Sequence, residues 1–292
     1  IVILQFVDMD MVQKLSVPIY IISIGLLVLT LLIGFGGDDW GAKSWIKIGP
    51  VRFQPSEVVK IGVMLSFSAA LDHFKKSINK PHILIALGVI ALVPVFLLMK
   101  QPDFGTSAVF LFFMALMLFY SGLHWGYIVG AIAFLVIAAP IAYTRLDSFQ
   151  QERILDFLNP ARDPLGSGYQ GLQGLIAIGS GQFLGRGYLQ GTQSQLGFIP
   201  EESTDYIFSV LVEELGFVGG VVLILAYAFF LYRILIIASR AKNIYGKSIC
   251  IGVAAMIFVH VFENIGMLIG LMPVTGIPLP FMSYGGTFQL IC

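Results

Sequence analysis

The sequence predicts an all-α, polytopic membrane protein, and three observations carry this prediction. Of its 292 residues, 57% are apolar and only 12% are charged, whereas soluble domains carry about 25% charged residues. Apolar runs recur along the chain at close to the roughly 20 residues that a helix needs to cross a bilayer. The runs are apolar on all sides rather than at every second residue, which excludes a transmembrane barrel.

Seven apolar runs approach or reach spanning length. They cover residues 17–35, 55–71, 82–100, 105–121, 126–143, 206–232 and 248–271. Residues 1–7 are expected to be the tail of an earlier span, and the chain stops inside a further apolar run. Because the sequence also begins at Ile1 rather than Met, we expect a fragment of about seven to eight spans, truncated at both ends.

Short basic loops predict the orientation of these spans. The loop between the second and third spans holds Lys75, Lys76 and Lys80, and the loop between the sixth and seventh holds Arg233, Arg240, Lys242 and Lys247. The positive-inside rule places both loops in the cytoplasm. Counting from them puts residues 36–54, 100–104, 144–205 and 272–287 on the outer face. Lys43, Lys47 and Arg52 in the first outer loop run against the rule.

The outer segment 144–205 is the place where we expect chemistry. It has no spanning run, and it is rich in charged residues and glycine. A structureless loop of that length is uncommon and usually functional. Its apolar, Gly-rich middle, residues 171–178, predicts short helices that lie at the membrane surface or dip into it.

Charged and polar residues at the outer end of the second span are the first candidate functional groups. Glu57 and Lys60 lie three residues apart on one helical face, so they either pair with each other or point into a shared cavity. An ion pair that only anchors the helix end is an equal alternative. Arg52 and Gln54 precede the helix start at Pro55, where the arginine can hold a phosphate or extend to the interface.

Asp205 is expected in the first turn of the sixth span. It is either an ordinary helix-start carboxylate or a general base, with Glu201 and Glu202 nearby. Glu213 and Glu214, one to two turns further along, form a second polar layer or only stabilise helix packing.

Two segments cannot continue a regular helix. Residues 276–286 contain two prolines and three glycines, which predicts a re-entrant or surface loop buried against protein. Residues 101–106 predict a tight turn with Asp103 or Thr106 as a cap. The four histidines show no metal-ligand spacing, the two cysteines allow no disulfide framework, and 17 basic against 17 acidic residues give no basic footprint for nucleic acid.

Several short blocks together resemble the SEDS family of shape, elongation, division and sporulation proteins. They are WIKIG at 45–49, RFQPSE at 52–57, QPDFGT at 101–106, GSG at 179–181, PE at 200–201 with TDYIF at 204–208, EELG at 213–216, and PLP at 278–280 with SYGG at 283–286. Their order between the expected spans makes the signal far more specific than any one block. The sequence GTQSQL at 191–196 resembles the elongation-type RodA branch rather than the division-type FtsW branch.

The resemblance implies a single, truncated transmembrane domain over residues 1–292, with ten spans in the complete family fold. It implies a multi-pass bacterial inner-membrane peptidoglycan glycosyltransferase that polymerises lipid II on the outer face for cell elongation and shape. The implied partners are a class B penicillin-binding protein, which supplies transpeptidation, and the elongation machinery. The family's essential carboxylate falls on Asp205.

The resemblance and the residue chemistry together give one hypothesis for the site. Asp205 deprotonates the acceptor hydroxyl, while cations stabilise the leaving pyrophosphate. The expected substrate-binding residues are Trp45, Lys47, Arg52, Gln54, Glu57, Lys60, Glu201 and Ser283. No cofactor is required by the sequence, although a divalent cation, Mg²⁺ or Mn²⁺, can share the work of the cations.

Two other functions stay open at this point. A lipid II flippase or transporter would use Glu57, Lys60 and Glu263 to line a path through the membrane. Two observations count against a transporter. The charges lie near the outer ends of the spans, and the sequence has no convincing internal repeat. A scaffold that docks another membrane helix through Gly216, Gly219 and Gly220 is the third candidate, and it is compatible with catalysis.

Overall fold

The computed structural model describes residues 8–36, 42–49, 51–144, 151, 155, 157, 168–199, 202–285 and 287. The chain forms two compact units. The first comprises Ile1–Ile128 with Arg233–Met256, and the second comprises Val129–Tyr232 with Ile257–Leu290. The helices α7 (Trp125–Tyr143), α11 (Ile207–Arg240) and α12 (Ile244–Leu268) contribute residues to both units.

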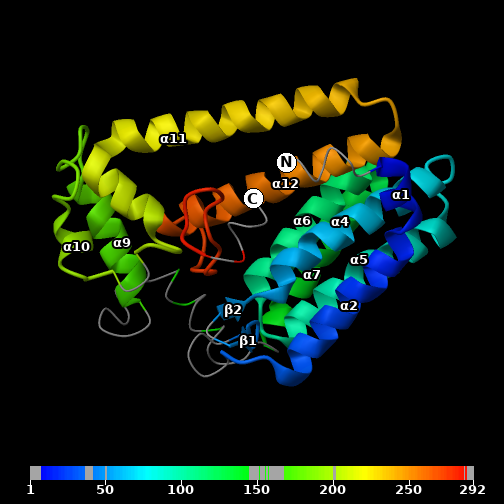
Figure 1. The fold of residues 1–292 in the computed structure, drawn as a ribbon, viewed down its shortest axis with the longest axis horizontal. Coiled ribbons are helices and arrows are strands. Elements are labelled where there is room, and N and C mark those ends of the chain that lie inside the picture. The colour runs from blue at the N-terminus through cyan, green and yellow to red at the C-terminus, as the bar shows by residue number, and fades with distance from the viewer. Residues whose placement is uncertain are drawn as a thin grey trace. The chain divides into compact units, whose positions relative to one another are not determined.

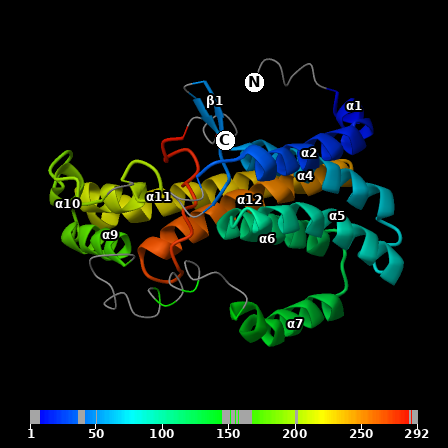
Figure 2. The same ribbon diagram turned by 90° about the horizontal axis from the view of Figure 1, so that it is seen from below.

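Four long helices lie side by side in the first unit (Figures 1 and 2). They are α2 (Ser16–Ile33), α4 (Pro55–Phe74), α5 (Pro81–Lys100) and α6 (Phe104–Tyr120), and the short α1 (Met9–Lys14) precedes them. Helix α4 is the centre of the packing, because Val59, Val63, Phe67 and Leu71 on it have no exposed surface. Its glycine Gly62 allows close contact with α2, as small residues do between membrane helices.

A β-hairpin connects α2 to α4. Strands β1 (Ile46–Ile48) and β2 (Val51–Phe53) pair antiparallel, with Lys47 directly opposite Arg52. Trp45 extends the ladder through a bridge to Phe35. The segment before β1 is bound to the turn between α5 and α6, because the Lys43 amide donates to the Gln101 carbonyl at 3.2 Å.

The second unit contains two short helices that precede α11. They are α9 (Tyr169–Ser180) and α10 (Thr192–Gln195). Helix α9 covers the apolar 171–178 stretch, which confirms the short helix expected there. Figure 1 shows both helices beside the first turns of α11.

Helix α11 is interrupted at Gly216, where φ is 70° and ψ is −171°. The interruption frees backbone groups that a continuous helix would pair internally, and the segment 182–187 pairs with them instead. The carbonyls of Glu213 and Glu214 accept from the amides of Arg186 and Gly187, both at 3.0 Å. On the other side of the break, the amides of Phe217 and Val218 donate to the carbonyls of Gln182 and Phe183 at 2.9 and 3.2 Å. Non-helical backbone inside an apolar helix is tolerated when protein groups satisfy it in this way.

All seven predicted apolar runs form helices. Four of the described helices, α2, α5, α11 and α12, are long and apolar enough to cross a membrane, while α6 and the first part of α7 are shorter apolar helices. Helix α4 carries Glu57, Lys60 and Asp72 among its apolar residues. The all-α membrane fold is confirmed, whereas the number of crossings and the single domain over residues 1–292 stay predictions.

Candidate active site

Asp205 lies in a turn whose three backbone carbonyls, at residues 203–205, accept hydrogen bonds from other parts of the chain. The Ser203 carbonyl accepts from the Tyr284 amide at 2.8 Å, and the Thr204 carbonyl accepts from the Ser283 hydroxyl at 2.5 Å. The Asp205 carbonyl accepts from the side-chain amide of Asn264 at 2.8 Å. Because these carbonyls bond to α12 and the C-terminal loop, α11 begins only at Ile207. The expectation that Asp205 lies inside the first helical turn is therefore wrong by two residues.

The C-terminal loop 276–285 reaches the carboxylate of Asp205 through a glycine. Gly276 has a φ of +70°, and a Cβ built on it would lie 3.3 Å from Asp205 Oδ2. The Asn264 side chain also donates to the Ile277 carbonyl at 2.8 Å, so one amide group binds both sides of the site. The described part of this segment up to residue 285 is irregular, as its prolines and glycines predicted.

Ser283 is fully buried. Its hydroxyl donates to the Thr204 carbonyl and accepts from the Leu279 amide at 2.7 Å. This geometry makes Ser283 a residue that holds the Asp205 turn in place. Its expected contact with substrate stays a prediction.

Glu213 has a role that the sequence left undecided. Its carboxylate is buried and accepts the backbone amides of Gln193 and Ser194 at 2.8 and 3.1 Å. The hydroxyls of Thr192 and Ser180 each donate to the same carboxylate at 3.4 Å. Glu213 therefore joins α10 and the end of α9 to α11. One feature of the sequence could have indicated this role. The N-cap of α10 is Gly191, which has no side chain, so the first amides of the helix need an acceptor from elsewhere in the chain.

The hairpin of the first unit brings four predicted site residues together. Lys47 and Arg52 face each other across the strands and are both exposed. Since side chains alternate along a strand, Trp45 and Gln54 fall on the same face as these two cations. This face of the hairpin therefore presents two exposed cations.

Glu57 and Lys60 form a buried ion pair. Glu57 Oε1 lies 2.8 Å from Lys60 Nζ, and the two side chains are 3% and 2% exposed. Of the arrangements open from the sequence, the structure shows direct pairing. A buried pair of this kind costs desolvation and is weak support for stability, which favours a functional reason for its presence.

The predicted site residues divide between the two units. Asp205 and Ser283 belong to the second unit, whereas the hairpin residues and the Glu57–Lys60 pair belong to the first. Glu201 lies outside the described residues. Within the described ranges no group of three or more His, Cys, Asp or Glu could hold a metal ion. The divalent cation that the sequence left open stays a prediction.

Comparison with known proteins decides the family. The chain matches the FtsW, RodA and SpoVE family model, described as "cell cycle protein", over residues 1–292. The chain belongs to this family. The resemblance expected from the sequence blocks is thereby confirmed.

Relatives within the FtsW/RodA/SpoVE family match most of the chain. Peptidoglycan glycosyltransferase MrdB of Escherichia coli (strain K12) is 41% identical over 273 residues, which cover 93% of this chain and 74% of MrdB. Stage V sporulation protein E of Bacillus subtilis (strain 168) is 38% identical over 276 residues, covering 91% of this chain and 73% of that protein. The probable peptidoglycan glycosyltransferase FtsW of Trichlorobacter lovleyi is 35% identical over 292 residues, covering 98% of this chain and 74% of that FtsW.

Solved structures of the family share the fold. A chain from a structure described as "structural coordination of polymerization and crosslinking by a peptidoglycan synthase complex" has a TM-score of 0.83 at 32% identity, covering 99% of this chain and 80% of that one. The rod shape determining protein RodA of Thermus thermophilus has a TM-score of 0.70 at 29% identity, covering 99% of this chain and 77% of RodA.

Proposed function

We propose that this chain polymerises lipid II into glycan strands on the outer face of the bacterial inner membrane, with Asp205 as the general base. Membership in the FtsW/RodA/SpoVE family supports the activity, because relatives with 35–41% identity are named peptidoglycan glycosyltransferases. The chain is a multi-pass membrane protein and a glycosyltransferase of cell-wall synthesis. The observation that carries the assignment of the base is the turn around Asp205, which three outside hydrogen bonds hold.

The reaction needs one base at the acceptor. Asp205 takes the proton from the 4-hydroxyl of the acceptor N-acetylglucosamine as that oxygen attacks the anomeric carbon of a lipid-linked N-acetylmuramic acid. The bond from this carbon to the pyrophosphate breaks, undecaprenyl pyrophosphate leaves with the electron pair, and the configuration inverts from α to β. A single displacement needs no covalent intermediate, so one carboxylate suffices.

The half-buried position of Asp205 suits this role. A general base has to be held in reach of the proton it removes. Gly276 leaves room beside Oδ2 because it has no side chain, while Asn264 and Ser283 fix the backbone on either side of the carboxylate. A site of this kind is preorganised, because its supporting residues are packed before substrate arrives.

The cations of the first unit are assigned to the pyrophosphate. Lys47 and Arg52 present two positive charges on one face of the hairpin, and arginine binds phosphate oxygens in a bidentate manner. Lys60, held by Glu57, is proposed as the third cation, and Trp45 and Gln54 as further contacts to the substrate.

A peptidoglycan substrate and a penicillin-binding partner fit the comparison with the synthase complex. We assign the partner to the class B transpeptidases and the pathway to cell elongation. The 41% identity to MrdB, against 35% to the FtsW of Trichlorobacter lovleyi, favours the elongation branch. The transport of lipid II across the membrane is the competing function for the same buried charges.

Glycan-strand formation from labelled lipid II separates polymerase from transporter. The assay uses the full-length protein with its penicillin-binding partner and compares the wild type with Asp205→Asn and Asp205→Ala at equal expression. Glu202→Gln, which removes another carboxylate from the same turn, is the matched control. We expect polymer from the wild type and the control but none from either Asp205 variant. Full polymerisation by the Asp205 variants would contradict the assignment, whereas lipid II movement across vesicles without polymer would favour the transporter.

A further inference from the structure

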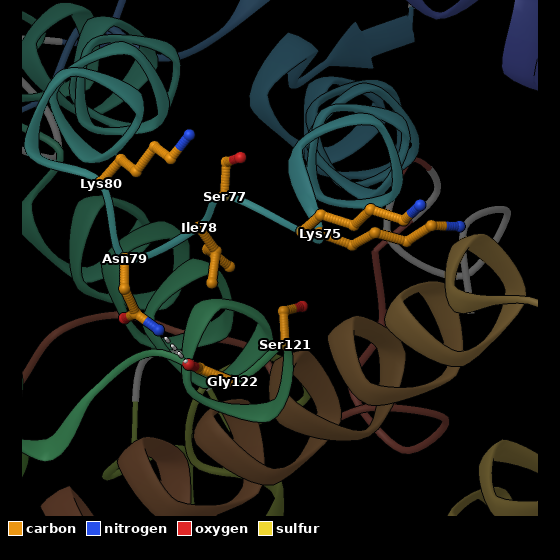
Figure 3. A pocket seen from close by; sticks show the side chains of 8 residues that line it. Lys75, Ser77, Ile78, Asn79, Lys80, Ser121 and Gly122 are labelled. Atoms are coloured by element: carbon orange, nitrogen blue, oxygen red, sulfur yellow. Dashed lines mark hydrogen bonds between the residues drawn. The ribbon is translucent and has the colours of Figure 1, made fainter.

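A cavity of about 390 Å³ lies between the α4–α5 loop and the α6–α7 loop, both of which belong to the first unit. Lys75, Lys76 and Lys80 line it, together with Ser77, Ser121 and the backbone at Gly122. Figure 3 shows Lys80 and Lys75 on opposite sides, with Ser77, Ile78 and Ser121 between them. Among the described residues, none that lines this cavity is acidic.

The two loops are fixed to each other by Asn79. Its side-chain amide donates to the Gly122 carbonyl at 3.0 Å, and its side-chain oxygen accepts the His124 amide at 2.8 Å. The Tyr127 hydroxyl donates to the Asn79 carbonyl at 3.2 Å. The backbone that carries the lysines is therefore held in one arrangement, which lowers the entropy lost when a ligand binds.

Two of the lysines are available to an anion. Lys75 pairs with Asp72 at 3.0 Å. Lys76 and Lys80 are exposed and have no ion-pair partner within the part of the chain that the structure describes. Two cations beside hydroxyl groups are the chemistry that binds phosphate oxygens.

Aromatic residues place this cavity at the level of lipid headgroups. Trp125 and Tyr127 at the start of α7 are 64% and 42% exposed, and Tyr120 at the end of α6 is 47% exposed. Exposed Trp and Tyr at the ends of membrane helices mark the boundary between acyl chains and water. A second cavity, lined by Asn79, His124, Gly126 and Tyr127, adjoins the same residues.

We propose that the lysine cavity binds the phosphate of an anionic phospholipid headgroup. Lys76 and Lys80 supply the charge, Ser77 and Ser121 flank the phosphate, and the acyl chains lie along the apolar surfaces of the adjacent helices. The lysines fall on the face that the positive-inside rule assigns to the cytoplasm, where anionic lipids attract basic segments. The residues that line this cavity are not among those proposed for the polymerase site.

Native mass spectrometry of the full-length protein in non-ionic detergent tests the proposal. Dioleoylphosphatidylglycerol, dioleoylphosphatidylcholine and inorganic phosphate are titrated separately against the wild type and against Lys76→Gln/Lys80→Gln. The control is Lys242→Gln/Lys247→Gln, which removes the same charge from the other basic loop. All four lysines lie at loops or helix ends, and thermal unfolding checks that each variant folds.

We expect the Lys76→Gln/Lys80→Gln variant to bind phosphatidylglycerol about 25-fold more weakly, from roughly fivefold for each lysine near an anionic surface. The control variant should match the wild type, and phosphatidylcholine should bind weakly to all. Equal binding by the variant, or an equal loss in the control, would overturn the proposal. Inorganic phosphate that binds the wild type as tightly as phosphatidylglycerol does, and loses affinity in the same variant, would assign the cavity to a free anion and overturn the lipid assignment.

Discussion

Gly276 lies where any larger residue would meet the carboxylate of Asp205. Its φ of +70° strains an L-residue, and a Cβ there would lie 3.3 Å from Oδ2. We expect Gly276→Ala to lower the polymerisation rate at saturating lipid II while leaving KM nearly unchanged, because the base is displaced rather than removed. A steady-state measurement of kcat and KM checks this.

Gly270→Ala is the matched control for that substitution. Gly270 has a similar φ of +75°, but nothing lies within 4 Å of a Cβ built on it. Both variants carry the same kind of backbone strain, about 1–3 kcal/mol. An equal fall in kcat for the two variants would mean that strain, and not the contact with Asp205, causes the effect.

Glu213 should matter more for stability than its neighbour Glu214. Replacing Glu213 by Ala leaves the half-buried amide of Gln193 and the buried amide of Ser194 without their acceptor, at a cost of about 1–3 kcal/mol. Glu213→Gln keeps one oxygen acceptor and should recover part of the loss. Thermal unfolding in detergent, with Glu214→Ala as the control, measures the difference. A Glu214→Ala variant that is equally unstable would show that the hydrogen bonds between Glu213 and α10 do not cause the loss.

At the scale of elements, the broken helix α11 is the feature that sequence reasoning missed. The apolar run 206–232 was expected to be continuous, since Gly216 is one of several glycines in it. The break depends on residues 182–187, which lie about thirty positions earlier and supply the four backbone partners. A pattern within the run carries no information about those partners.

Gly216→Ala should prevent the docking of the 182–187 segment onto α11. A Cβ at this position would lie 2.3 Å from the Gly185 amide nitrogen and 2.5 Å from the Phe183 carbonyl oxygen, both of which are backbone atoms. We expect a loss of roughly 2 kcal/mol or more and faster proteolysis of the loop. Gly88→Ala in α5, where a Cβ meets nothing within 4 Å, is the control. Equal stability of the two variants would contradict the close contact between Gly216 and the backbone of residues 182–187.

The hairpin makes a separate prediction about substrate binding. Arg52→Ala should weaken lipid II binding about 10- to 150-fold, since hydrogen bonds to charged groups contribute roughly 1.5–3 kcal/mol. Arg52→Lys retains the charge but loses the bidentate geometry, so an intermediate effect is expected. Titration of labelled lipid II at low and high salt measures both. An Arg52→Ala variant with unchanged affinity and unchanged salt dependence would remove Arg52 from the pyrophosphate site.

At the scale of the whole molecule, the sequence predicted the long helices and the irregular segment 276–285, but not the hairpin between α2 and α4. Long apolar runs define α2, α5 and α12 through composition alone. The strands of the hairpin are only three residues long, which is too short to show a periodic pattern in the sequence. They are recognised only from the pairing between them. Asp205, Arg52 and Lys60 were candidates from their charge at the outer ends of spans, and the family resemblance sharpened their roles. Asn264 and Gly276 became visible only through tertiary contacts with Asp205.

The central claim is that Asp205 removes the acceptor proton, and a single-turnover experiment tests it most directly. Full-length wild type and Asp205→Asn are loaded with labelled lipid II, the bound lipid is measured, and the formation of the first glycosidic bond is followed over time. We predict unchanged binding with a rate at least roughly 100-fold lower in Asp205→Asn, the scale of a lost general base. An Asp205→Asn variant that binds lipid II normally and forms the bond at the wild-type rate would contradict the account.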